Sequence, residues 1–184
     1  MIQIGLPTAT IDTPLEHLTA CHRRIEERLD TLVKAADLLL ADQATALAAI
    51  VRCLEFLDGS GALHTEDEEC SLFPRLRVKL LADQVAYLDS LEEQHVTAGT
   101  ILMRLKELVG EATRVSQASG ELAEQYRECA EQLRSIYRSH IQSEDSILSA
   151  LAKQSLSEFE IAEIAGEMRA RRERESSEHA RQGV

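Results

Sequence analysis

The sequence predicts an all-α protein, built as an up-down-up-down four-helix bundle with a short C-terminal fifth helix. Gly and Pro, which disfavour helix interiors, account for only 8 and 3 of the 184 residues, whereas Ala, Leu, Glu, Gln and Arg are abundant. Apolar residues recur every three or four positions in four long segments, which is the spacing of one helix face. Four such helices joined by short loops favour antiparallel neighbours and hence a bundle.

The first helix is expected to begin at Thr13-Pro14 and to run to about residue 40, because Pro is favoured at the first helical position. The second is expected from about Ala44 to Phe73 and to stop near Pro74, since Pro cannot donate a helical hydrogen bond. The two glycines of residues 58–61 would weaken this helix. Its apolar stripe stays on one face only if the helix continues through them, so we expect continuity.

The third helix is expected from about Asp83 to Val109, with Gly110 as its C-cap, because Gly commonly ends helices. A polar loop follows, and the fourth helix is expected from about Glu121 to Lys153. Both carry apolar residues at helical spacing, so they complete the predicted bundle.

A short fifth helix is expected over about residues 157–172, where apolar residues again recur at helical spacing. The remaining residues are charged and have no apolar pattern, so we expect this end to fray. The predicted organisation is a bundle domain over residues 1–156 and a C-terminal helix with a charged tail over residues 157–184.

Composition excludes several classes of partner. The net charge of −12 opposes binding to nucleic acid or to an anionic membrane, and aromatic residues, at 3%, are too few for base-stacking platforms. No segment approaches the roughly 18 apolar residues of a membrane span, and the N-terminus lacks the basic start and apolar run of a signal peptide. We therefore expect a cytoplasmic protein, whose four cysteines, without a CxxC pair, are free thiols.

An internal repeat relates the second and fourth helices. Residues 53–74 and 129–150 align without gaps, and the identities lie mostly on one helical face. The matched positions are Cys53 with Cys129, Glu55 with Glu131, Leu57 with Leu133, His64 with His140, Glu68 with Glu144, and Leu72 with Leu148. Each copy follows a helix with one inward histidine, so the chain is expected to consist of two helix pairs related by an approximate twofold axis.

Histidines supply the first sign of a functional site. Four of the six lie one on each predicted bundle helix, each on the apolar stripe: His22, His64, His95 and His140. The other two histidines do not share this pattern, because His17 lies off the helix face of His22 and His179 lies in the tail. A single histidine on an apolar stripe is usually a core residue, but packing alone does not explain one on each of four helices.

Two carboxylates extend this pattern. Glu68 and Glu144 each follow an inward histidine by four residues, which places both side chains on the same helix face one turn apart. Four histidines and two shared glutamates could bind two metal ions, and such a mixed set with open positions suits iron better than a closed zinc site. Without a metal, these buried polar groups would have no evident partner. The neighbouring acids, Glu66, Asp67 and Glu69, are expected to face solvent.

Four stretches carry a resemblance to a known family. They are ACHRRIEERL, HTEDEECSLFPRL, LEEQH and YRSHIQSED, and in this order they resemble the helix motifs of the hemerythrin-like, or HHE cation-binding, proteins over about residues 12–153. The resemblance implies a non-heme di-iron centre with an oxo or hydroxo bridge. It implies that His22 and His64 bind one iron, that His95 and His140 bind the other, and that Glu68 and Glu144 bridge the two.

Departures from the family narrow this expectation. Oxygen-carrying hemerythrins have a second histidine one turn after that of the third helix, where this chain has Gly99, and place an aspartate five residues after the last histidine. Asp145 has that offset, whereas Glu144 has the offset of the repeat. The chain therefore resembles the four-histidine subgroup, which includes di-iron proteins linked to nitric oxide and iron–sulfur repair. Glu26 and Tyr137, each one turn from a ligand histidine, are candidate extra ligands or neighbours of the ligands.

The leading functional hypothesis is a di-iron protein that binds and reacts with O2, NO or peroxide, as a sensor, a scavenger or a low-turnover oxidoreductase. One alternative is an iron-handling or iron-sensing protein without catalysis, and another is a structural metal site, such as zinc, in a helical interaction module. The sequence names no redox or signalling partner.

Overall fold

The computed structural model describes the backbone of residues 11–182 and the side chains of residues 11–177. Over this range the chain is helical and contains no strand, which confirms the all-α prediction. The elements are α1 (Pro14–Ala41), α2 (Gln43–Phe56), η1 (Leu57–Gly61), α3 (Ala62–Asp67), η2 (Glu68–Leu72), α4 (Phe73–Arg77), α5 (Ala82–Arg114), α6 (Gly120–Ser143), η3 (Glu144–Leu148), α7 (Ser149–Ser155) and α8 (Glu158–Gln182), where η marks a π-helical turn.

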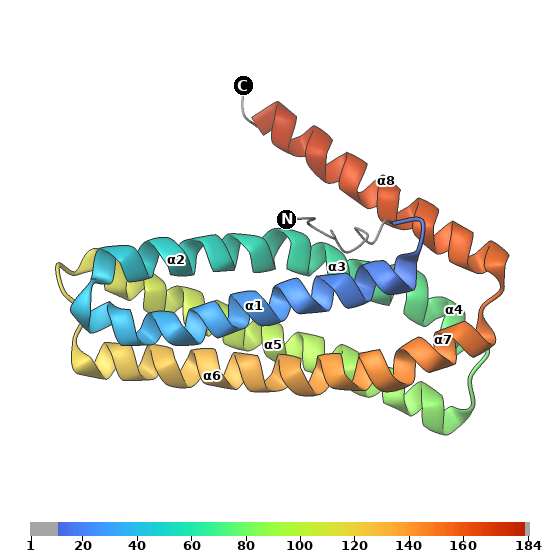
Figure 1. The fold of residues 1–184 in the computed structure, drawn as a ribbon, viewed down its shortest axis with the longest axis horizontal. Coiled ribbons are helices and arrows are strands. Elements are labelled where there is room, and N and C mark those ends of the chain that lie inside the picture. Colours follow the sequence, from blue (N-terminus) through green and yellow to red (C-terminus); the bar gives the residue numbers. More distant parts are fainter. Residues whose placement is uncertain (1–10, 183–184) are drawn as a thin grey trace, which may run out of the picture.

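Four rods form the bundle, because α2 to α4 are one continuous helix and α6 to α7 are another (Figure 1). The rod of α1 contacts those of α2 and α6, and α5 contacts the same two. Successive rods run in opposite directions along the long axis (Figure 1), which is the predicted up-down-up-down arrangement.

Two predicted helix ends are wrong. The second rod does not stop near Pro74 but continues to Arg77, because the π turn η2 comes just before the proline and changes the hydrogen-bond register. Gly110 is not a C-cap, since α5 continues through it to Arg114. Continuity through residues 58–61 is confirmed, as the π turn η1 rather than as regular α-helix.

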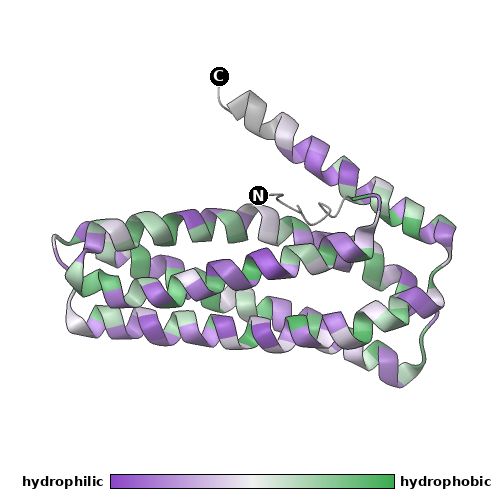
Figure 2. Cartoon of the chain, viewed as in Figure 1, coloured by the Kyte–Doolittle hydropathy of each residue, from purple (hydrophilic) through white to green (hydrophobic). Residues whose placement is uncertain are grey.

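The C-terminal helix is longer than predicted, because α8 remains helical to Gln182 instead of ending near Arg172. It crosses the outside of the bundle over α3, η2 and α1, and its later turns project away (Figure 1). Its hydrophobic residues lie mainly in the first turns (Figure 2), where Ile164, Ala165 and Met168 are buried. The side chain of His179 lies outside the described residues.

The apolar core forms two clusters along the bundle axis. One contains Ile25, Leu57 and Ala98, and the other contains Leu18, Leu72 and Leu91. On each rod, the predicted ligand residues lie between a residue of one cluster and a residue of the other. The fold therefore encloses a polar layer between two apolar ones.

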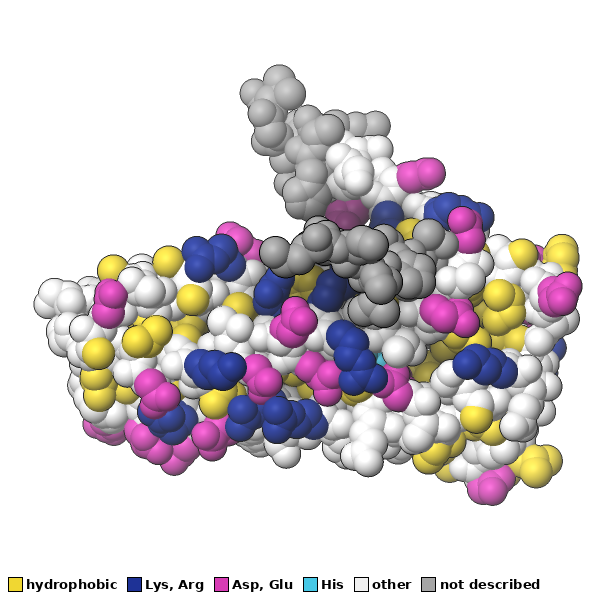
Figure 3. Space-filling model, viewed as in Figure 1, with side chains coloured by type: hydrophobic (Ala, Val, Ile, Leu, Met, Phe, Trp, Pro, Cys, Tyr) yellow, Lys and Arg dark blue, Asp and Glu magenta, His cyan; other side chains and the backbone are white. Residues whose placement is uncertain are grey.

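The surface is charged and mixed. Lys and Arg side chains are interspersed with Asp and Glu over the visible face of the bundle, and almost no histidine is visible there (Figure 3). No helix within the described range is both long and apolar enough to cross a membrane. The four cysteines are free thiols, and Cys70 is the exposed one.

Candidate metal centre

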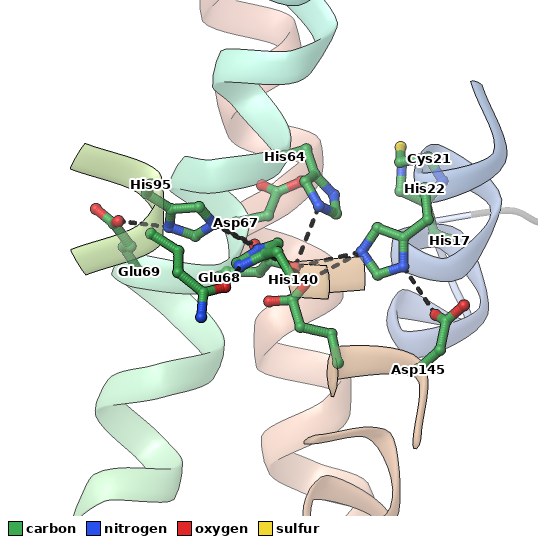
Figure 4. A network of polar contacts seen from close by, with 12 residues as sticks. His17, Cys21, His22, His64, Asp67, Glu68, Glu69, His95, His140 and Asp145 are labelled. Atoms are coloured by element: carbon green, nitrogen blue, oxygen red, sulfur yellow. Dashed lines mark hydrogen bonds and ion pairs between the residues drawn. The ribbon is translucent and has the colours of Figure 1, made fainter. Parts of the chain in front are cut away.

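All six predicted site residues meet in the polar layer. Figure 4 labels five of them, His22, His64, Glu68, His95 and His140. The histidines come from four different rods: His22 from α1, His64 from α3, His95 from α5 and His140 from α6. The two carboxylates each begin a π turn, Glu68 in η2 and Glu144 in η3. Each of the six side chains is at most 7% exposed.

The Nε2 atoms of the histidines point toward the two carboxylates. Glu144 Oε2 lies 3.1 Å from Nε2 of both His22 and His140. Glu68 Oε1 lies 3.2 Å from His64 Nε2, and its Oε2 lies 3.5 Å from His95 Nε2. The carboxylates therefore lie at the centre of the cluster, with histidines around them.

Two overlapping groups of four could each hold a metal ion, with ligand atoms within 4.8 Å of one another. The first is His22, His64, Glu68 and Glu144, and the second is Glu68, His95, His140 and Glu144. Since both glutamates belong to both groups, the geometry fits two neighbouring ions that share them.

The cluster is not satisfied by its own hydrogen bonds. His22 Nε2, Glu68 Oε2 and both carboxylate oxygens of Glu144 are buried and have no hydrogen-bond partner. The short distances from Glu144 to His22 and His140 therefore lack hydrogen-bond alignment. A buried polar atom without a partner costs about 1–3 kcal/mol. These atoms face the shared centre, so cations placed there would satisfy them.

Burial and mutual contacts shift the pKa values of the cluster in both directions. Burial, followed by the Glu144 charge, raises the pKa of Glu68 well above its usual value. Burial lowers the pKa of His64 and of His95. Burial would also lower the pKa of His22, but its contacts with Glu144 and Glu68 outweigh this effect and raise that pKa to about 11. Burial opposes ionisation of Glu144, but its contacts with His140 and His22 hold that pKa below its usual range.

The Nδ1 atoms, on the opposite side of each histidine ring from Nε2, face other residues. His22 Nδ1 lies 2.8 Å from Asp145 Oδ1, and His95 Nδ1 lies 2.8 Å from Glu69 Oε1 (Figure 4). His140 Nδ1 lies 3.1 Å from Gln94 Oε1. His64 Nδ1 is buried and makes no hydrogen bond.

The two additional candidates lie at the edge of the cluster. The Glu26 carboxylate accepts a hydrogen bond from Arg23 at 3.0 Å and belongs to neither group of four. The Tyr137 ring packs edge-on against the His140 ring, with centroids 6.4 Å apart. Burial raises the pKa of Tyr137 to about 12, and the charges of Glu68 and Glu144 add to this shift.

Three neighbouring acids do not form the solvent-exposed face that the sequence analysis expected. Asp67 is fully buried and accepts hydrogen bonds from Arg171 and Arg172 of α8, both at 2.7 Å. Glu69 is 37% exposed but bonds to His95. Only Glu66 fits the expectation, with 57% of its side chain exposed.

Sequence reasoning missed the roles of Glu69 and Asp145, although a signal was present. In both copies of the repeat the inward glutamate is followed directly by a second acid. It also missed Tyr87 of α5, a partly buried residue whose hydroxyl oxygen is buried. Burial raises the pKa of Tyr87 to about 12, and the Glu144 charge acts in the same direction.

A small cavity opens beside His22. It has a volume of about 20 Å³, taken as the space open to the centre of a water molecule, and it is lined by Leu15, Leu18, Thr19, His22, Glu68, Leu72, Glu144, Asp145, Leu148 and Ser149. The space therefore admits a water molecule and suits only a very small ligand. On the His95 side of the cluster, the Phe73 ring stacks on the His95 ring, with the two ring centroids 6.4 Å apart.

Comparison with known proteins gives two findings. Residues 13–152 match the family described as the hemerythrin HHE cation binding domain. An uncharacterized protein of Haemophilus influenzae is 30% identical over 109 residues, which make up 56% of this chain and 63% of that protein. The match thus covers less than two thirds of the relative's own length.

Proposed function

Because the chain belongs to the hemerythrin HHE cation-binding family, we propose that it is a non-heme di-iron protein that binds and reacts with a small ligand. The observation that carries this proposal is the set of buried, unpartnered polar atoms that face the centre of the cluster. Bound iron would supply open coordination positions and a change of oxidation state.

The ligand assignment follows from the two overlapping groups. His22 and His64 would hold one iron, and His95 and His140 would hold the other. Glu68 and Glu144 would be shared by the two, together with an oxo or hydroxo group. Imidazole with carboxylate is a donor set that suits iron, whereas Mg²⁺ and Ca²⁺ prefer oxygen ligands alone.

The small size of the cavity, about 20 Å³, supports O2, NO or peroxide as the ligand. The internal repeat explains why the cavity lies on the His22 side of the cluster. Ser149 occupies the position that corresponds to Phe73 in the other copy, and the smaller side chain leaves open the space that Phe73 fills beside His95.

The residues around the centre favour reaction over reversible oxygen carriage. Gly99 replaces the additional histidine of the oxygen carriers, so the centre has fewer protein ligands and more open positions. The centre lies between two apolar clusters, and the Tyr87 and Tyr137 phenols remain protonated at neutral pH near the carboxylates. A sensor, a scavenger and a low-turnover oxidoreductase all fit this environment.

Metal analysis with optical spectra tests the proposal. We expect two irons per chain and near-ultraviolet bands from an oxo bridge, and Glu68→Ala should lose the pair of metals whereas the exposed control Glu66→Ala should not. Mixing the reduced protein with O2, NO and H2O2 then tests reaction. A colourless zinc protein, or equal metal loss in both variants, would refute the di-iron assignment.

A further inference from the structure

Two acidic pairs occupy equivalent places in the repeat. Glu68-Glu69 begins η2 and Glu144-Asp145 begins η3. The first acid of each pair lies in the cluster, and the second bonds to Nδ1 of a histidine on another rod, at 2.8 Å in both cases. The same local arrangement therefore appears twice, once in each half of the bundle.

These contacts define which ring nitrogen faces the centre. A carboxylate accepts hydrogen bonds, so the Nδ1 atoms of His22 and His95 donate to Asp145 and Glu69 and carry the proton. The lone pair of each neutral ring then lies on Nε2, which is the nitrogen that faces Glu68 and Glu144.

Each proposed iron position has one histidine of this kind. His22 shares its group with His64, whose Nδ1 makes no hydrogen bond, and His95 shares its group with His140, whose Nδ1 faces the neutral amide oxygen of Gln94. Each group has one carboxylate-bound histidine because each half of the bundle contains one acidic pair.

We propose that Glu69 and Asp145 are positioning residues, one for each metal ion. Each fixes the tautomer and orientation of a ligand histidine on a neighbouring rod and adds negative charge next to it, which strengthens the metal–histidine bond and stabilises the higher oxidation state. This inference rests on the proposed metal centre and assigns a role to residues outside both groups of four.

The contacts of Asp145 oppose a role as a direct ligand. Its Oδ1 lies on the side of the His22 ring that faces away from the cluster, and its Oδ2 accepts a hydrogen bond from Arg23 at 2.6 Å. Both oxygens of Asp145 therefore have hydrogen-bond partners, whereas those of Glu144 have no hydrogen-bond partner. Glu144 is thus the bridging residue although Asp145 has the offset of the aspartate in oxygen carriers.

The test compares charge and hydrogen bonding separately. Asp145→Asn and Glu69→Gln retain an acceptor oxygen but remove the charge, and Asp145→Ala and Glu69→Ala remove both. Glu93→Ala, an exposed acid two residues before His95, is the matched control. The metal-free proteins are titrated with Co²⁺ and Zn²⁺ against a competing chelator, and the reduction potentials of the iron-loaded proteins are measured.

We expect all variants to bind two ions per chain. Each Ala variant should weaken one of the two sites by about 10- to 100-fold, and the amide variants should weaken it less but still raise the reduction potential. Affinities and potentials equal to those of Glu93→Ala would overturn the positioning role. Loss of one ion in Asp145→Asn would instead make Asp145 a ligand. If the unaltered chain binds neither Co²⁺ nor Zn²⁺, the proposed metal centre itself is wrong.

Discussion

Single residues make the two halves of this centre unequal. The halves share their histidines and glutamates through the repeat, but Phe73 in one copy corresponds to Ser149 in the other. Phe73 stacks on His95, whereas Ser149 lines the cavity beside His22. In the proposed function, this difference between the copies, rather than the residues that match, would determine the side from which a small ligand approaches.

Replacing Ser149 with Phe should close the cavity. A ring placed there as Phe73 is placed opposite would exceed the available space, so we expect both irons to remain bound while NO binds the reduced protein at least about tenfold more slowly, which corresponds to about 1.4 kcal/mol of added barrier. Stopped-flow absorbance with NO measures this rate. Ala150→Phe is the control, because residue 150 is exposed and does not line the cavity. Equal rates in both variants would show that the ligand uses another route.

At the level of elements, the helices could be predicted and their local geometry could not. Helical periodicity depends on neighbours three or four residues away, so the four rods, the repeat and the inward histidines were all visible in the sequence. The π turns η1, η2 and η3 do not follow from this periodicity. Contacts between distant residues were equally hidden, since Asp67 is buried against Arg171 of α8, 104 residues further along the chain.

The attachment of α8 yields a prediction for this element. Asp67 is fully buried between Arg171 and Arg172, so Asp67→Ala leaves Arg171 buried without its main partner and should destabilise the metal-free protein by about 3–5 kcal/mol. Chemical denaturation measures the loss, and hydrogen exchange should show early opening of α8. Arg169→Ala is the control, because its partner Asp12 is 77% exposed and such pairs contribute about 0–1 kcal/mol. Similar losses in the two variants would contradict the structural role of Asp67.

At the scale of the whole molecule, the candidate metal centre brings together side chains from all four rods. The six candidate ligand residues lie between the two apolar clusters, and each rod contributes at least one of them. The sequence was sufficient to predict which six residues meet, because the repeat and the helical spacing mark them. It did not reveal the partners of Nδ1, since Asp145 reaches His22 across 123 residues of chain.

Metal binding should therefore stabilise the entire bundle, and the stabilisation should depend on pH. In the metal-free chain the pKa of His22 is raised to about 11, so this ring holds a proton at neutral pH that metal must displace, and the raised pKa of Glu68 favours its protonated form in the same way. Affinity should then fall as pH falls, by about tenfold, or about 1.4 kcal/mol, per pH unit for each proton released. Calorimetric unfolding between pH 8 and pH 6 should show a shrinking difference between metal-loaded and metal-free protein. Glu68→Ala should abolish that difference and Glu93→Ala should retain it, whereas a pH-independent difference would mean that these groups do not bind the metal.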